Sequence, residues 1–144
     1  MTVRTFVYSS DRLLGRLMTP VKIVNPLTQK SFDTYALWDT GATSSAISSV
    51  AAEFLQLKRI GKVVASGIYK SKRVNSYYAQ LYLSENVRIP IFPSEYQEPP
   101  RDGVDCIIGM DVISQGDLTI SNYKGHTRFC FRIPSAGDID LAEK

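Results

Sequence analysis

The residues of this chain best placed to do chemistry are Asp39, Thr40 and Gly41, an Asp-Thr-Gly triplet that occurs only once. Residues 35–38 before it are mostly apolar and predict a buried strand that holds the Asp39 carboxylate in a fixed, partly desolvated place, where it could act as a general acid or base. Gly41 allows a sharp turn and the close approach of another backbone, and the Thr40 hydroxyl can hydrogen-bond backbone across the site. A strand-ending turn without chemistry is the plainer interpretation, because Asp and Gly are common in turns.

A second motif lies far downstream. Residues 106–108, Cys-Ile-Ile, predict a short apolar strand, and Gly109 permits close backbone packing directly after it. Residues 110–115 then predict a short helix that ends at Gly116. Because this second motif follows the Asp-Thr-Gly triplet in the same chain, the interpretation of the triplet as a simple turn is less favoured.

Together the two motifs resemble the retroviral-type aspartic proteases, the retropepsins. In that family an apolar strand carrying Asp-Thr-Gly-Ala is followed by a flap hairpin, then by an apolar-apolar-Gly turn and a short helix packed beneath the site. The resemblance covers residues 18–133 approximately. It implies a mainly β fold, the retropepsin-like closed or orthogonal β-barrel of the acid proteases, with one or two short helices.

The resemblance implies an aspartic endopeptidase that works through a pair of carboxylates and needs no cofactor. One ionised carboxylate takes a proton from water while its protonated twin polarises the carbonyl oxygen of the peptide bond. Asp33 comes nearest to a second copy of the motif within the chain, but Tyr35 stands where the turn glycine is needed. We therefore expect the twin to be Asp39 of a second copy, in a homodimer with a two-fold axis between the two carboxylates.

The resemblance also implies roles for the residues around Asp39. Thr40 would lock the two active-site loops together, Gly41 would supply a carbonyl that binds substrate backbone, and Ala42 would complete the active-site loop. Thr43 would lie among the substrate-binding residues, at a position where retroviral members often have an acidic residue. Those members often have an Arg where this chain has Met110, so the intersubunit charge network made by such residues is absent.

By resemblance, residues 64–70 occupy the flap hairpin that closes over a peptide or protein substrate. Gly67, Ile68 and Tyr69 would form its substrate-binding tip. An ordinary surface hairpin with a glycine turn is the alternative. The stretch is basic, which favours a solvated face but also allows attraction to acidic substrates.

Composition is that of a globular domain, with 144 residues, 44% apolar and 22% charged. We expect one domain over residues 1–144, with residues 134–144 as a flexible tail. No apolar run is long enough to cross a bilayer, and the N-terminus lacks the apolar stretch of a secretory signal, which predicts a cytoplasmic protein without a membrane partner. A net charge of +3 with scattered basic residues gives nucleic-acid binding no specific support.

The remaining residues offer little for other chemistries. One His and no close Cys pair make no metal signature, so we expect no metal site. Cys106 and Cys130 both lie in apolar, strand-like runs and are expected to be buried, reduced thiols. A catalytically silent relative, whose dimeric β-sheet scaffold binds peptides or a partner protein, stays open as the alternative to the enzyme.

The elements expected to position the motifs are mostly strands. Ser48 or Ser49 would cap a helix that runs to about Leu57. A strand over residues 87–92 would be broken at Pro90. Hairpins are expected over residues 18–24 with 31–38, within residues 63–83, and over residues 118–122 with 127–133.

Overall fold

The computed structural model describes residues 2–66, 71–96 and 103–142. Its fold is mainly β, as the sequence predicts. The strands are β1 Arg4–Ser9, β2 Met18–Val24, β3 Ser31–Trp38, β4 Ala46–Ser48, β5 Arg59–Ser66, β6 Ser71–Tyr77, β7 Ala79–Ser84, β8 Val87–Ile91, β9 Ser94–Tyr96, β10 Val104–Ile108, β11 Asp117–Ser121 and β12 Arg128–Ile133. The helical elements are α1 Ser49–Leu55, α2 Met110–Ile113 and the short 3-10 turn η1 Tyr123–Gly125.

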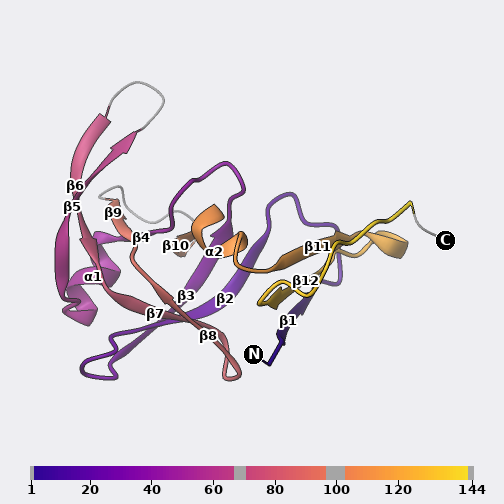
Figure 1. Cartoon of the computed structure of the whole chain (residues 1–144), viewed down its shortest axis with the longest axis horizontal. Coiled ribbons are helices and arrows are strands. Elements are labelled where there is room, and N and C mark those ends of the chain that lie inside the picture. The colour runs from indigo at the N-terminus through magenta and orange to yellow at the C-terminus, as the bar shows by residue number, and fades with distance from the viewer. Residues whose placement is uncertain (1, 67–70, 97–102, 143–144) are drawn as a thin grey trace.

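Nine strands form one curled sheet in the order β5-β6-β9-β4-β10-β3-β2-β7-β8 (Figure 1). Strand β10 enters between β3 and β4, parallel to β3 and antiparallel to β4. The consecutive residues Asp105 and Cys106, which point to opposite faces, are both buried, so this strand is covered on both faces. The pairing sets Ile108 opposite Trp38, so the chain leaves β3 toward Asp39 beside the end of β10.

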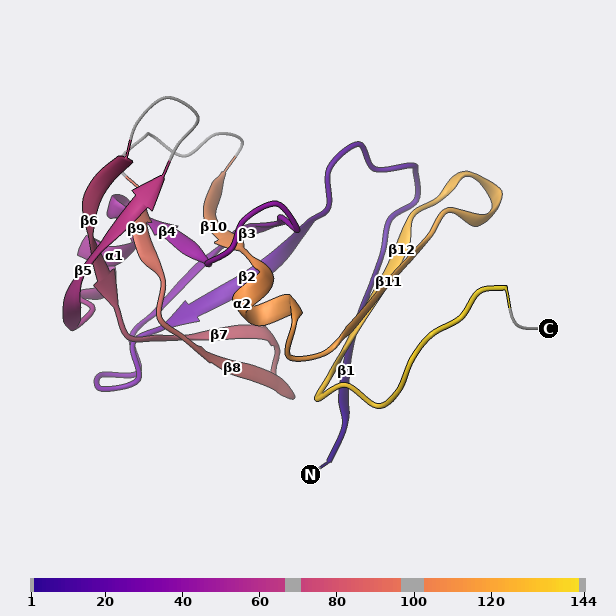
Figure 2. The ribbon, with the colours of Figure 1, turned by 45° about the horizontal axis from the view of Figure 1, so that its top comes forward.

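The other three strands form a separate sheet in the order β1-β12-β11, at the end of the molecule away from β5 and β6 (Figure 2). Its inner face carries Phe129 and Phe131, which are almost fully buried. The Trp38 ring packs edge-on against both, with centroid distances of 5.0 Å to Phe129 and 5.3 Å to Phe131. Such aromatic pairs contribute about 0.5–1.5 kcal/mol each beyond their buried area, so the residue before Asp39 is firmly anchored in the core.

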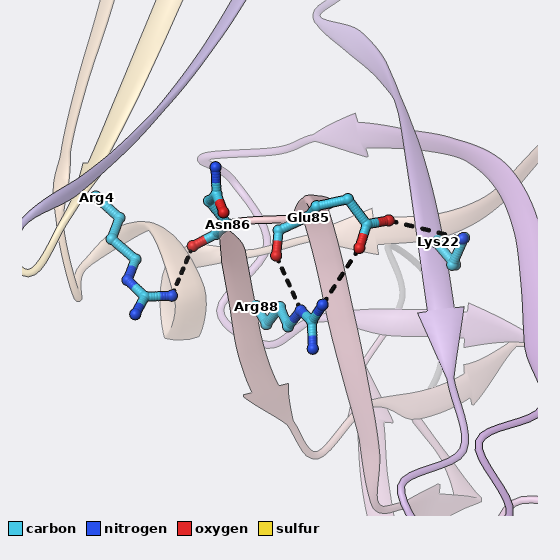
Figure 3. A network of polar contacts seen from close by, with 5 residues as sticks. All are labelled: Arg4, Lys22, Glu85, Asn86 and Arg88. Carbon is cyan, nitrogen blue, oxygen red and sulfur yellow. Dashed lines mark hydrogen bonds and ion pairs between the residues drawn. The ribbon is translucent and has the colours of Figure 1, made fainter.

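Polar contacts at the turn between β7 and β8 join the two sheets (Figure 3). Arg4 of β1 donates from Nη1 to the Asn86 carbonyl at 2.9 Å. In the same turn Glu85 accepts from Arg88 at 3.2 Å and lies 4.0 Å from the Lys22 ammonium. Exposed ion pairs of this kind contribute little individually, so those around Glu85 add little to the stability of the fold.

The expected elements are largely present. Ser48 caps α1, its hydroxyl accepting from the Ala51 N–H at 3.1 Å, although the helix ends at Leu55 rather than Leu57. The expected break at Pro90 is wrong: β8 runs through it, with Pro90 opposite Gln80. Because β8 is the last strand of its sheet, the N–H that proline lacks is not needed by a neighbour.

Two further details go beyond the sequence-based expectation. Strand β1 was not expected, yet its Phe6 is buried and stacks on Trp38 with the ring centroids 6.5 Å apart. Helix α2 is shorter than the expected residues 110–115, because the chain turns out of the helix after Ile113. Within the described residues, none of the helices has the length and apolar character required to span a bilayer.

Candidate active site

Asp39 stands directly after β3, at the start of a turn that runs to β4. Its N–H donates to the Ile108 carbonyl at 2.9 Å, which fixes its backbone to the end of β10. Its Oδ1 accepts from the Gly41 N–H at 2.8 Å. Among the described residues its Oδ2 has no hydrogen-bond partner, and the side chain is only half-buried. The carboxylate is therefore held by one oxygen and open at the other.

The turn is tied from below by α2. The Met110 N–H donates to the Ala42 carbonyl at 2.8 Å, and the Asp111 N–H donates to the Thr43 carbonyl at 3.2 Å. In return the Asp111 carboxylate accepts from both the hydroxyl and the N–H of Ser45, at 2.7 and 3.0 Å. A charge-assisted contact of this kind resists movement, so the start of α2 and the end of the active-site turn behave as one unit.

Gly109 lets α2 lie this close to the active-site turn. A Cβ at Gly109 would come within 2.8 Å of the Ala42 carbonyl oxygen and of backbone atoms of Ser44. Its N–H also donates to the Ser45 hydroxyl at 3.0 Å. The expected close packing after the Cys-Ile-Ile strand is thus a direct backbone contact beneath the candidate catalytic residue.

A second carboxylate, Asp105, is buried farther along β10 and is fully used by its neighbours. It accepts from the Ser48 hydroxyl at 2.7 Å and the Thr34 hydroxyl at 3.0 Å, while its own N–H donates to the Thr34 oxygen at 3.1 Å. Since Ser48 also caps α1, Asp105 joins β10, β3 and α1. Asp105 therefore has a structural role. Each of its carboxylate oxygens already accepts a hydrogen bond, so neither is free to pair with Asp39.

The other predicted site residues of the turn lie together. Thr40, Gly41 and Thr43 are exposed and Ala42 is half-buried, all within the segment that α2 supports. Gly67, Ile68 and Tyr69, the predicted flap tip, lie outside the described residues. Strands β5 and β6 of the predicted flap hairpin pair from Arg59 opposite Tyr77 to Ser66 opposite Ser71.

The contact between Ser45 and Asp111 beneath the candidate site is not predicted by the sequence. The one signal in the sequence is an acidic residue in the first turn of an expected helix, where carboxylates are generally favoured. Nothing in the sequence pairs that carboxylate with a serine 66 positions earlier. The pairing exists only because β10 enters the sheet beside β3 and β4.

Cys106 and Cys130 are both free thiols, as expected, but only Cys106 is fully buried. Desolvation by burial, followed by the charges of Asp111 and Asp105, raises the pKa of Cys106 to about 12. It therefore stays protonated and packs as a small apolar side chain. The expected burial of Cys130 is met only in part, because its side chain is half-buried.

Three solved structures illustrate the similarity of the fold to known proteins. A retropepsin-like aspartic protease from Rickettsia conorii has a TM-score of 0.55 at 11% identity, covering 92% of this chain and 96% of that one. EIAV protease complexed with the inhibitor HBY-793 has a TM-score of 0.52 at 20% identity, over 73% and 91% of the two chains. The retroviral protease-like domain of Ddi1 from Leishmania major has a TM-score of 0.50 at 19% identity, over 74% and 82%.

No family model matches the chain, and no curated protein matches its sequence. The structural similarities nevertheless define the class of fold: it is the fold of the retropepsin-like aspartic proteases. The predicted fold class is thereby confirmed.

Proposed function

We propose that two copies of this chain pair so that their Asp39 carboxylates form one catalytic dyad, which hydrolyses peptide bonds. The observation that carries this proposal is the geometry of Asp39 itself. Asp39 directly follows β3 of a retropepsin-like fold. Its Oδ1 accepts a hydrogen bond from the Gly41 N–H, and its Oδ2 has no partner among the described residues. The function is that of an aspartic endopeptidase, a hydrolase acting on peptide or protein substrates.

The chemistry requires two carboxyl groups about 3 Å apart, which cannot both be ionised and therefore share one proton. The ionised member takes a proton from a water molecule as the water oxygen attacks the carbonyl carbon. The protonated member donates to the carbonyl oxygen, and a tetrahedral intermediate forms. When the C–N bond breaks, the protonated carboxyl group gives its proton to the nitrogen, and the ionised one takes a proton from a hydroxyl of the intermediate. The dyad then holds one shared proton again.

The contacts of the other acids support a twin from a second copy. Asp105 and Asp111, the carboxylates nearest along β10 and α2, are occupied by Ser48, Thr34 and Ser45. Asp33 is exposed on β3, six residues before Asp39. A homodimer supplies the missing partner without any rearrangement of these contacts.

The remaining roles follow from this arrangement. Thr40 and Gly41 are exposed next to Asp39, where Thr40 would join the two active-site loops and the Gly41 carbonyl would bind substrate backbone. Thr43 would lie beside them in the substrate-binding cleft. The hairpin of β5 and β6 would close over the substrate as a flap, with Gly67, Ile68 and Tyr69 at its tip. One domain over residues 1–144, a flexible tail and a cytoplasmic location complete the proposal.

Digestion of a peptide library tests the proposal. We expect the native chain to cleave extended peptides, a pepstatin-like inhibitor to block cleavage, and Asp39→Asn to abolish it. Sedimentation should show a dimer at assay concentrations. A dimer that cleaves no peptide between acidic and neutral pH would instead support the catalytically silent binding module, and a monomer would count against both.

A further inference from the structure

The positive charge of this protein is concentrated in one hairpin. Residues 58–77 contain six Lys and Arg residues and no Asp or Glu, so the rest of the chain holds 11 of the 17 basic residues and all 14 acidic ones. The net charge is therefore +6 in the hairpin and −3 elsewhere, although the whole chain carries only +3. A separation of charge on this scale produces a local field that attracts acidic groups.

Three of these cations share one face of the β5–β6 hairpin. Residues directly opposite each other in an antiparallel pair lie on the same face, and so do residues two apart along a strand. Lys62 lies opposite Asn75, and Val64 lies opposite Arg73, which is two residues before Asn75. Arg59 reaches the same face, since its Nη1 lies 3.5 Å from Asn75 Oδ1. We call Arg59, Lys62 and Arg73 the basic face.

The basic face is exposed and its charges are not neutralised locally. All three side chains are exposed, and none forms an ion pair within the described residues. Glu95, which contacts β6, is buried and accepts from the Tyr77 hydroxyl at 3.2 Å. An acidic group from another molecule would meet three cations that form no ion pair with any described residue.

Strand β5 also offers an unpaired edge. It is the first strand of the nine-stranded sheet, so one of its sides has no neighbouring strand from the described part of the chain (Figure 1). Val63 points to the face opposite Lys62 and is exposed, and Val64 within the basic face is 65% exposed. Lysines on an edge strand discourage pairing with ordinary strands, and the same charges favour an acidic one. The edge is thus suited to a strand that is acidic on one face and apolar on the other.

Residues 138–141 of this chain have that pattern. They read Asp-Ile-Asp-Leu, which in an extended conformation sets Asp138 and Asp140 on one face and Ile139 and Leu141 on the other. All four residues are exposed and lie outside any helix or strand, with Leu141 exposed by 89%. The segment begins at a fixed point, because Arg132 donates to the Gly137 carbonyl at 3.1 Å.

We propose that β5 of one copy binds residues 138–141 of a second copy as an added strand. Asp138 and Asp140 then lie over the basic face, while Ile139 and Leu141 cover the side of Val63. The partner must be a second copy, because β5 and the C-terminal segment lie at opposite ends of the molecule in both views (Figures 1 and 2). Added strands bind through backbone hydrogen bonds and gain specificity from alternate side chains. Here the basic face selects the two acidic side chains, and the side of Val63 selects the two apolar ones.

This surface lies on the hairpin that the catalytic proposal takes as the flap, so its test measures binding rather than cleavage. A labelled peptide of residues 136–142 is titrated into the Asp39→Asn protein and followed by fluorescence anisotropy. We expect saturable binding that weakens about ten-fold or more in the K62E/R73E variant, because attraction becomes repulsion. A peptide carrying D138K/D140K should bind K62E/R73E and not the parent protein. The matched control is K124E/R128E, which reverses two exposed charges on the β11–β12 hairpin and should leave binding unchanged.

The pattern is tested separately from the charge. A peptide of the same composition, with both acids adjacent and both apolar residues adjacent, should bind about ten-fold more weakly. In the whole protein, sedimentation should show less association for K62E/R73E, and combining it with D138K/D140K in one chain should restore the association. The proposal would be overturned if the peptide showed no saturable binding, or if the rearranged peptide bound as tightly as the native one. It would also be overturned if a single-stranded oligonucleotide displaced the labelled peptide as well as the unlabelled peptide does.

Discussion

Two carboxylates of this molecule differ in how completely their surroundings use them. Asp117 accepts from the Ser135 hydroxyl, the Ala136 N–H and the Arg132 guanidinium, the last at 2.6 Å. These hydrogen bonds, that from Ser135 foremost, lower the pKa of Asp117 to about 2. Asp39 accepts a single hydrogen bond, from the Gly41 N–H, and keeps its other oxygen open among the described residues.

The difference separates a carboxylate that holds structure from one whose free oxygen suits the proposed catalysis. Around Asp117, every contact fastens the end of β12 and residues 135–136 to the start of β11. Around Asp39, one contact goes to the carboxylate, and the others go to the backbone and to neighbouring residues, notably Ser45 and Asp111. The turn is rigid while its acid is open, which is the arrangement that acid–base catalysis needs.

The largest expected effect is the loss of peptide cleavage in Asp39→Asn. The amide cannot take a proton from water, so we expect kcat/KM to fall by about 10³-fold or more. The free energy of unfolding should change by less than about 0.5 kcal/mol, because few contacts involve the carboxylate. Peptide digestion and chemical denaturation measure the two quantities.

Asp117→Asn is the matched control for that experiment. It removes a carboxylate of the same kind from a region far along the chain from Asp39, and cleavage should persist in the folded protein. Loss of cleavage in a folded Asp117→Asn protein would break the distinction between the two carboxylates.

A smaller effect is expected when the support beneath Asp39 is disturbed. In Gly109→Ala the new methyl group meets the Ala42 carbonyl oxygen and Ser44 backbone at 2.8 Å, which the turn cannot avoid without moving. We expect a loss of about 1–3 kcal/mol in the free energy of unfolding, together with lower kcat. Gly15→Ala is the control, since a Cβ at Gly15 meets nothing within 4 Å. Equal stability of the two variants in urea denaturation would contradict the proposed close support.

The smallest effect concerns the pH dependence of stability at Asp117. Its pKa is about 2 in the folded protein and about 3.9 in the unfolded chain, so folding is favoured by its ionised form. This contribution is complete above about pH 4 and is lost as the pH falls toward 2. Asp117→Asn should therefore lose stability at neutral pH but little near pH 2. Thermal unfolding at the two pH values checks this, and an equal loss at both would contradict it.

Much of the fold could be predicted because its signals are local. The hairpin of β2 and β3 was evident from two apolar runs around a turn, and Ser48 from its place before an apolar helical face. The prediction of a break at Pro90 was wrong because a proline interrupts a central strand but is tolerated in an edge strand, and the sequence does not show that β8 lies at an edge. Strand β1 was missed because its neighbour in the sheet, β12, lies more than a hundred residues later.

By itself, the sequence determined that one acid would stand at the end of an apolar strand, and that a glycine would follow the later apolar strand. Both follow from residue type and from neighbours a few positions away. Only the tertiary structure decided that Asp111 accepts a hydrogen bond from Ser45 and that both Asp105 oxygens accept hydrogen bonds. It also decided that Asp39 has one oxygen without a partner among the described residues. The physical reason is that the strand order decides which side chains are close enough to form hydrogen bonds. Asp105 and Asp111 reach their partners only because β10 lies between β3 and β4.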